Sequence, residues 1–143
     1  MKDKVFIDTN IFIYAFLNSS KDKNDYNKHI LSKEFLSSFQ NNQKIIISTQ
    51  VCNEYYSALL KHKISDDEIQ KSLKELISAV KATPVTQATV LSSFNLKKRY
   101  KYSYWDSLIL SSALENDCKI IYTEDMKHQQ MIEDKVQIIN PFK

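Results

Sequence analysis

Apolar residues follow two alternating patterns along the chain. Short continuous runs rich in isoleucine and valine are typical of strands that are buried on both faces of a sheet. They cover residues 4–8, 44–48, 119–122 and 136–139, with a shorter extended piece expected at 83–85. Between these runs, helical spacing of apolar residues and polar start signals predict helices over residues 10–18, 25–39, 49–61, 65–80, 86–100, 103–115 and 125–133.

Strands that alternate with helices indicate an α/β fold in which helices cover both faces of a parallel sheet. The 143 residues correspond to one domain, which we assign to residues 1–143. Hydrophobic residues make up 43% and charged residues 26% of the chain, and these are the values of a soluble globular protein. We find no repeat, linker or low-complexity segment in the sequence.

Glycine is absent from the sequence, which restricts both its turns and its possible ligands. Backbone positions with positive φ are expected to fall to Asn or Asp, and the loops at 40–43 and 115–118 are the candidate places. Without glycine, neither a P-loop nor a GxGxxG fingerprint can bring its backbone close to a phosphate. The common nucleotide-binding functions of α/β chains are therefore disfavoured.

The charge balance is mildly basic, with a formal net charge of +3. It permits a polyanionic partner without requiring one. Cys52 and Cys118 belong to no CxxC pair, so we expect two buried thiols in a reducing compartment. Asp8 interrupts the first apolar run, which removes a secretory signature, and no apolar run is long enough for a bilayer. We therefore expect a cytoplasmic protein without a membrane partner.

Four carboxylates stand at predicted junctions between elements. Asp8 ends the first strand, Glu54 lies early in the helix after the second, Asp106 lies in the first turn after Ser103, and Asp125 follows the strand at 119–122. Ligands of open α/β sheets bind at the carboxyl ends of the strands, where we expect these acids to emerge. Each acid taken alone could instead be a helix cap or a residue that complements the helix dipole.

Two features favour a metal site formed by all four acids. Asp106 is flanked by apolar residues, and a partly buried charge needs a partner or a metal. No lysine or arginine is spaced to neutralise the whole set, and clustered carboxylates repel one another without a cation. Mg²⁺ or Mn²⁺ suits such oxygen donors. The histidines are dispersed, which disfavours zinc, although His128 lies close enough to Asp125 to leave a role in the site open.

Four segments resemble, in order, the acidic motifs of the PIN-domain family of ribonucleases, and especially its VapC-like toxins. They are Phe6–Asn10, Ser48–Glu54, Tyr104–Ile109 and Thr123–Met126. The resemblance covers essentially the whole chain. It implies a PIN-like three-layer α/β/α fold with a central parallel sheet of about five strands. One difference is Gln129, which follows His128 where relatives often have glycine.

The resemblance also implies a function and roles for individual residues. The protein would be a metal-dependent endoribonuclease and the toxin of a toxin–antitoxin pair, with RNA of the transfer-RNA type as substrate, a cognate antitoxin as partner, and a homodimeric state. The catalytic, metal-binding residues would be Asp8, Glu54, Asp106 and Asp125. Asn10 and Thr123 would orient these acids without binding the metal themselves. Glu124 could share the ligand role with Asp125.

The segment Lys97–Tyr102 is the best candidate for contact with RNA. Its cations Lys97, Lys98, Arg99 and Lys101 could bind phosphates, and its tyrosines could stack on unpaired bases. The alternative is a solvated helix end whose cations offset the helix dipole.

The sequence disfavours two other classes of function. Phosphatases that form an aspartyl-phosphate need Asp-x-Asp after the first strand, whereas this chain has Asp8-Thr9-Asn10. A phospho-receiver domain would also want an acidic pair there. The remaining alternative is a non-catalytic PIN-like module that binds RNA or protein, and substitution of Asp106 would separate it from an enzyme.

Overall fold

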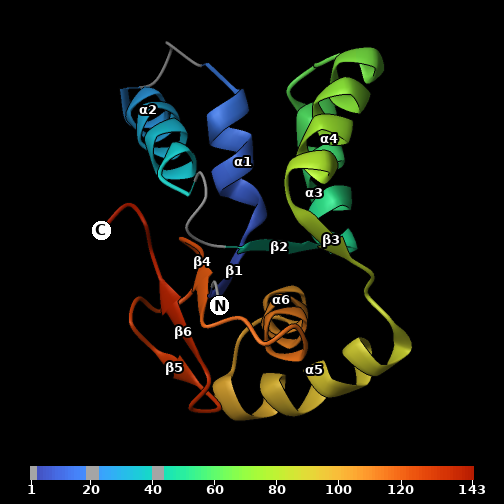
Figure 1. Ribbon diagram of the computed structural model, residues 1–143, viewed down its shortest axis with the longest axis vertical. Helices are drawn as coiled ribbons and strands as arrows, with labels where there is room; N and C mark the ends of the chain where they lie inside the picture. The colour runs from blue at the N-terminus through green and yellow to red at the C-terminus, as the bar shows by residue number, and fades with distance from the viewer. Residues whose placement is uncertain (1–2, 19–22, 40–43) are drawn as a thin grey trace.

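A computed structural model describes residues 3–18, 23–39 and 44–143. Within these ranges six helices and six strands follow one another (Figure 1). They are β1 (Lys4–Ile7), α1 (Thr9–Phe16), α2 (Lys23–Ser37), β2 (Lys44–Ser48), α3 (Thr49–Lys61), α4 (Asp66–Ala79), β3 (Lys81–Thr83), α5 (Gln87–Tyr100), α6 (Tyr104–Glu115), β4 (Ile120–Tyr122), β5 (Met131–Ile132) and β6 (Val136–Ile139).

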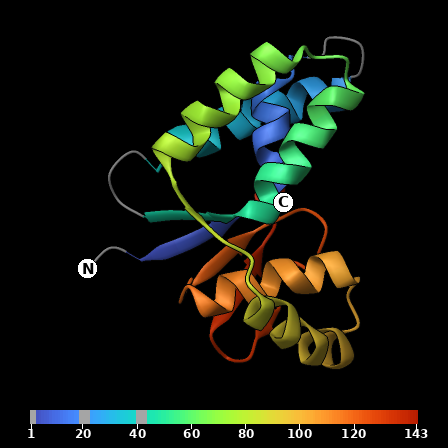
Figure 2. The same cartoon turned by 90° about the vertical axis from the view of Figure 1, so that its right-hand side faces the viewer.

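The strands form one sheet in the order β3-β2-β1-β4-β6-β5, which confirms the α/β prediction. Every pairing is parallel except that of β5 with β6. The described sheet has six strands where about five were expected, because a two-residue strand adds to its edge. Helices α1 to α4 lie on one face of the sheet and α5 and α6 on the other, so the sheet is the middle of three layers (Figure 2).

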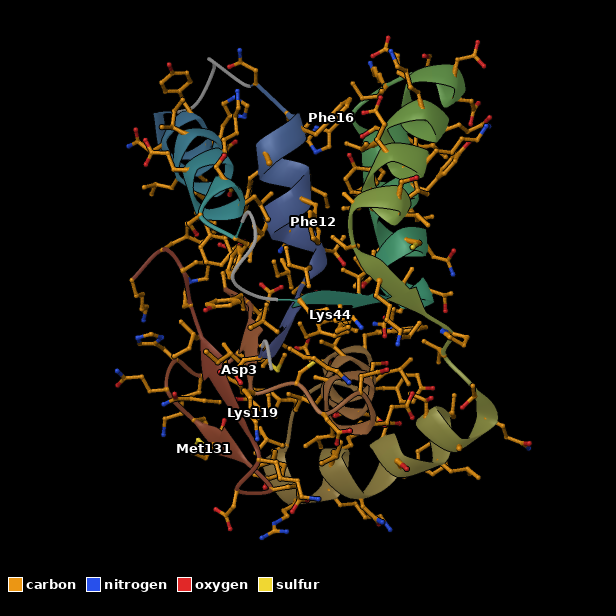
Figure 3. All side chains as sticks on the ribbon, in the orientation of Figure 1. Asp3, Phe12, Phe16, Lys44, Lys119 and Met131 are labelled. Carbon is orange, nitrogen blue, oxygen red and sulfur yellow. The ribbon has the colours of Figure 1, made fainter. Side chains whose placement is uncertain are left out.

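The core lies on both faces of the central strand β1. Val5, Phe6 and Ile7 are fully buried, and so are Ile46, Ile47 and Ile121 of its two neighbours. Strands covered on both faces must be apolar at every position, which explains their continuous apolar sequences. The neighbouring strands begin at one edge of the sheet, near Asp3, Lys44 and Lys119 (Figure 3). Their carboxyl ends therefore meet at the opposite edge.

Serine side chains cap two of the helices, and the two cysteines are buried as predicted. The Ser65 hydroxyl accepts a hydrogen bond of 3.2 Å from the Glu68 amide at the start of α4. The Ser103 hydroxyl accepts one of 3.1 Å from the Asp106 amide at the start of α6. Cys52 and Cys118 are buried free thiols. Such capping satisfies amides that the first turn of a helix leaves without partners.

The helix predicted over residues 125–133 is wrong. The chain instead turns and forms β5, whose residues pair antiparallel with β6. The Gln129 amide donates to the Ile138 carbonyl at 2.6 Å, and the Ile138 amide donates to the Gln130 carbonyl at 2.9 Å. These contacts between distant backbone groups override the local preference for a helix. The extended piece expected at 83–85 is also displaced, since β3 covers Lys81–Thr83.

Positive φ occurs at more residue types than expected. Asp117, in the predicted loop at 115–118, has φ of 58°. However, Lys63, Lys101, Gln129 and Glu133 also adopt positive φ, so the expected restriction to Asn and Asp is wrong. A chain without glycine must place other residues where helices end or a hairpin turns. The loop at 40–43 lies outside the described residues.

Among the described residues, no helix combines the length and the apolar character that crossing a bilayer requires.

Helix α1 is packed between its neighbours. Phe12 is buried in the core, and Phe16 points from α1 toward α3, where its ring meets Tyr55 edge-on with centroids 6.5 Å apart.

Candidate active site

Asp8 is the most constrained of the four acids. It follows β1 directly and caps α1, with one carboxylate oxygen accepting a 2.7 Å hydrogen bond from the Thr9 amide. Its other oxygen accepts a 2.8 Å hydrogen bond from the Thr123 hydroxyl. Because β1 and β4 are parallel neighbours, Ile7 pairs with Tyr122, and the residues after them emerge side by side. Burial raises the pKa of Asp8, and the charge of Asp106 adds to this shift.

Glu54 reaches the same place from the second turn of α3. Its carboxylate accepts a hydrogen bond of 3.1 Å from the Thr9 hydroxyl. Thr9 therefore contacts two acids, with its amide on Asp8 and its hydroxyl on Glu54. The sequence indicated no role for Thr9, because no pattern among its neighbouring residues predicts that its hydroxyl bonds to a side chain 45 residues away.

Asp106 and Asp125 complete the set. Asp106 is half-buried in the first turn of α6, as its apolar neighbours predicted. Asp125 follows β4, and its amide donates to the Thr123 hydroxyl at 3.2 Å. Its carboxylate accepts a hydrogen bond of 3.2 Å from the Asn10 amide group. Asn10 and Thr123, which the family resemblance assigned to orient the acids, thus contact Asp125 and Asp8.

The four acids influence one another electrostatically. The pKa of each is raised, first by burial and then by the charge of its acidic neighbours. Every one of the possible pairs among Asp8, Glu54, Asp106 and Asp125 contributes to these shifts. Four carboxylates from four separate elements therefore share one site, in which repulsion accumulates and a cation would relieve it.

The donor set of this site fits a hard cation such as Mg²⁺ or Mn²⁺, since it offers only oxygen ligands. In the described part of the chain, no three acidic, histidine or cysteine side chains already stand in an arrangement that would hold an ion. Hydrogen bonds with Thr9 and Thr123 instead occupy both oxygens of Asp8. The donor atoms are therefore of the type that Mg²⁺ or Mn²⁺ binds. In the described residues, however, they are not already arranged around the position of an ion.

Glu124, which sequence analysis left as a further metal ligand, takes part in a different network. Its carboxylate forms an ion pair of 2.8 Å with Lys28 and accepts hydrogen bonds from Tyr14 and, at 3.3 Å, from Asn10. Burial followed by the hydrogen bond to Glu124 raises the pKa of Tyr14 to about 12. Glu124 thus joins α1 and α2 to the loop that carries Asp125.

His128 faces the C-terminal segment. Its Nδ1 accepts a hydrogen bond of 3.0 Å from the Asn140 amide, which fixes the ring as the Nε2-protonated tautomer when it is neutral. This contact supplies a structural role for His128.

The basic segment at the end of α5 divides into two parts. Lys97, Lys98 and Lys101 are exposed and line, with Phe94, a surface hollow of about 540 Å³. Arg99 instead forms an ion pair of 2.7 Å with Glu133. The tyrosines of the segment also make internal bonds: Tyr100 accepts from the Glu133 amide, and Tyr102 bonds to Gln130 and accepts from the Lys127 amide.

A groove of about 690 Å³ adjoins the acids between α1 and α3. It is lined by Glu54 and by other residues on the same face of α3, by Thr9, Asn10 and Ile13 of α1, and by Trp105 at the start of α6. No sequence signal pointed to this groove, because its walls come together only in the folded chain.

Comparison with known proteins gives a family and a set of similar folds. The model of the PIN domain matches residues 5–133. A toxin–antitoxin complex from Klebsiella pneumoniae is 19% identical, with a TM-score of 0.68 over 96% of this chain and 97% of the other. VapBC-1 from nontypeable Haemophilus influenzae is 19% identical, with a TM-score of 0.68 over 98% and 99%.

A third similar structure is VapC20 of Mycobacterium tuberculosis, described as a toxin that cleaves the Sarcin-Ricin loop. It is 16% identical, with a TM-score of 0.64 over 85% of this chain and 91% of the other. A search of curated proteins finds no significant match. At these identities the likeness to solved structures establishes the fold.

Proposed function

The chain belongs to the PIN-domain family, and from this premise we propose that it is a metal-dependent endoribonuclease. The observation that carries the proposal is the meeting of Asp8, Glu54, Asp106 and Asp125, in which the charges of the other three acids raise the pKa of Glu54 and every acid has its pKa raised by at least one other. Raised carboxylate pKa values from burial and a specific set of charged neighbours are typical of functional sites. Isolated helix caps would not require this convergence.

In the proposed site, these four acids would hold Mg²⁺ or Mn²⁺. When bound, the ion would supply Lewis-acid activation of water and of the scissile phosphodiester. Thr123 and Thr9 would hold the carboxylates of Asp8 and Glu54 in place, and Asn10 would hold that of Asp125. Such supporting hydrogen bonds fix the orientation of metal ligands.

The substrate must overcome the negative field of four acids. Lys97, Lys98 and Lys101 supply exposed cations at the end of α5 and just after it, a few residues before Asp106 in the chain. We propose that they contact the RNA backbone, as predicted from the sequence. Arg99 contributes less to this contact than was predicted, since Glu133 already pairs with it. Tyr100 and Tyr102 pack against the core and make internal hydrogen bonds, so we propose no stacking on RNA by these two rings.

We further propose that the protein acts as the toxin of a toxin–antitoxin pair. Two of the structures with the same fold are toxin–antitoxin assemblies, and a third is described as a toxin that cleaves the Sarcin-Ricin loop. By this analogy the partner is a cognate antitoxin, and the substrate is a structured RNA with an accessible loop, of which transfer RNA is our first candidate. A homodimer in the cytoplasm is the expected state.

The test is cleavage of transfer RNA and of an unstructured RNA by the purified protein, with Mg²⁺, with Mn²⁺ and with chelator. Asp106→Asn, purified identically, removes one ligand charge and should lower cleavage by at least about 100-fold. Asp117→Asn is the matched control, because it removes an exposed acid at the far end of α6 and asparagine tolerates the positive φ found there.

Metal-dependent cleavage by the wild type and by Asp117→Asn, with loss in Asp106→Asn, would support the nuclease. Equal cleavage by all three proteins would trace the activity to a contaminant. RNA binding without cleavage by the wild type would support the alternative, a non-catalytic binding module, and Asp106→Asn should then bind as well or better.

A further inference from the structure

Trp105 is exposed, although most residues of its helix are buried. It is the only tryptophan of the chain, and 61% of its surface is exposed. The residues from Ser107 to Ala113 on the same helix are all buried. A large aromatic side chain loses favourable burial energy when it stays in water, so its exposure beside a candidate active site calls for a partner.

The start of α6 is anchored so that Trp105 keeps its place. Its backbone carbonyl accepts a hydrogen bond of 3.1 Å from the side-chain amide of Gln50 on α3. Its ring lies edge-on to that of Tyr104, with centroids 5.2 Å apart and planes at 68°. Ordering a side chain before a ligand arrives lowers the entropic cost of binding.

Gln50 has a spare hydrogen-bond acceptor. The residue is 6% exposed and lines the groove between α1 and α3. Its side-chain nitrogen donates to Trp105, while its side-chain oxygen has no hydrogen-bond partner in the part of the chain that the structure describes. A buried polar atom without a partner is costly and is therefore a place where a ligand gains by supplying a donor.

The groove continues from these two residues past Glu54 along α3. Asn53, Ser57 and Lys61 line its further length. From Gln50 to Lys61 the helix advances by about 16 Å. The groove therefore joins an aromatic surface, side chains that form hydrogen bonds and one cation to the acidic site.

We propose that Trp105 and Gln50 form a binding subsite for one unpaired RNA base next to the scissile phosphate. The base would stack on the exposed indole, and one of its N–H groups would donate to the free oxygen of Gln50. Unpaired bases expose the flat faces that aromatic side chains recognise, whereas paired bases hide theirs within a duplex. The inference rests on the proposed ribonuclease function and adds which two side chains receive the base beside the cut.

The first test uses Trp105 as its own reporter, since no other tryptophan contributes to the fluorescence. The Asp106→Asn protein in Mg²⁺ is titrated with a labelled single-stranded RNA and with an abasic oligonucleotide of equal length and charge. Anisotropy of the label measures binding, and quenching of Trp105 measures stacking. We expect both ligands to bind, with strong quenching by the RNA and little by the abasic chain.

The second test measures cleavage by variants. Removing a stacking platform weakens RNA binding by about 5- to 150-fold, so Trp105→Ala should lose this much in kcat/KM. Trp105→Phe should retain most of the activity, because phenylalanine also stacks. Tyr26→Ala is the matched control, as it removes an aromatic ring that is 44% exposed on α2, outside this groove. An RNA whose cut site is closed into a duplex should resist the wild type.

The two tests separate this inference from the function on which it rests. Binding of RNA without quenching, equal quenching by the abasic chain, or full activity of Trp105→Ala would each overturn the base subsite and leave the nuclease standing. Quenching specific to the RNA, together with absence of cleavage by the wild-type protein, would support the base subsite and overturn the nuclease. Absence of RNA binding by the Asp106→Asn protein would overturn the subsite.

Discussion

The hydroxyl of Thr123 donates a hydrogen bond of 2.8 Å to the carboxylate of Asp8, a residue 115 positions earlier in the chain. The same hydroxyl oxygen accepts a hydrogen bond of 3.2 Å from the Asp125 amide. One buried threonine thus connects two of the four acids across the neighbouring strands β1 and β4. Its side chain is part of the geometry of the site, although it carries no charge.

Substitution of Thr123 should weaken metal binding. Thr123→Val removes both hydrogen bonds with little change in volume, and loss of such a supporting contact typically costs about 10- to 100-fold in metal affinity or activity. Thr123→Ser keeps the hydroxyl and should stay close to the wild type. Calorimetric titration with Mn²⁺ checks this directly, and equal affinity in the valine and wild-type proteins would contradict the role assigned to Thr123.

The metal-free protein should become less stable as the pH rises above the ordinary carboxyl range. Burial and mutual repulsion raise the pKa of Glu54 and its acidic neighbours above their ordinary values of 4.5 for Glu and 3.8 for Asp. Between these and the higher folded values, the folded state binds more protons than the unfolded state. The free energy of unfolding contributed by these groups therefore falls with rising pH through that window.

Glu54→Gln isolates this effect, because glutamine keeps the shape and removes one charge. Without metal at neutral pH, the variant should be more stable than the wild type by less than about 1 kcal/mol, because Glu54 is exposed and solvent screens the repulsion, and the difference should shrink in acid. Mg²⁺ should reverse the order by stabilising the wild type more. Urea unfolding at several pH values measures this, with Glu34→Gln, an exposed acid on α2, as the neutral control. A less stable metal-free Glu54→Gln protein would refute the predicted repulsion.

The lysines of α5 should determine part of the salt dependence of RNA binding. Removing two cations that each contact one phosphate of a single strand lowers the slope of log affinity against log salt by about 1.4. We therefore expect a flatter salt dependence for the double variant Lys97→Ala and Lys98→Ala. The double variant of Lys71 and Lys74, which are exposed on α4, is the control. Identical slopes for both variants would remove this surface from the RNA site.

The Glu124 network should matter more for stability than the other ion pair found in the described residues. The Glu124 side chain is 13% exposed, so its loss leaves Lys28 and Tyr14 without their acceptor, at a cost of about 1–3 kcal/mol. Glu133→Ala removes a pair with Arg99 whose side chain is 65% exposed, and should cost less than about 1 kcal/mol. Urea unfolding of Glu124→Ala and Glu133→Ala decides this, and equal losses would show that burial does not distinguish the pairs.

The sequence was most informative where the signal was local. The apolar runs at 44–48 and 136–139 match β2 and β6, and the Ser103 cap marks the start of α6. The helix predicted over 125–133 is wrong because this segment pairs with β6 and turns at residues with positive φ. Neither feature leaves a periodic pattern of apolar residues in the sequence. The sequence indicated neither the ion pair of Lys28 nor the groove beside Trp105, because both depend on residues far away in the chain.

By itself, the sequence determined the alternation of strands and helices and the position of four acids at the ends of elements. Burial, capping and turn preferences act over a few residues, so they can be read from neighbours. Only the tertiary structure decided which side chains hold those acids, that Glu124 pairs with Lys28, and that Trp105 and Gln50 border a groove. These arrangements follow from strand order and helix packing, which bring together residues that have no relationship along the chain.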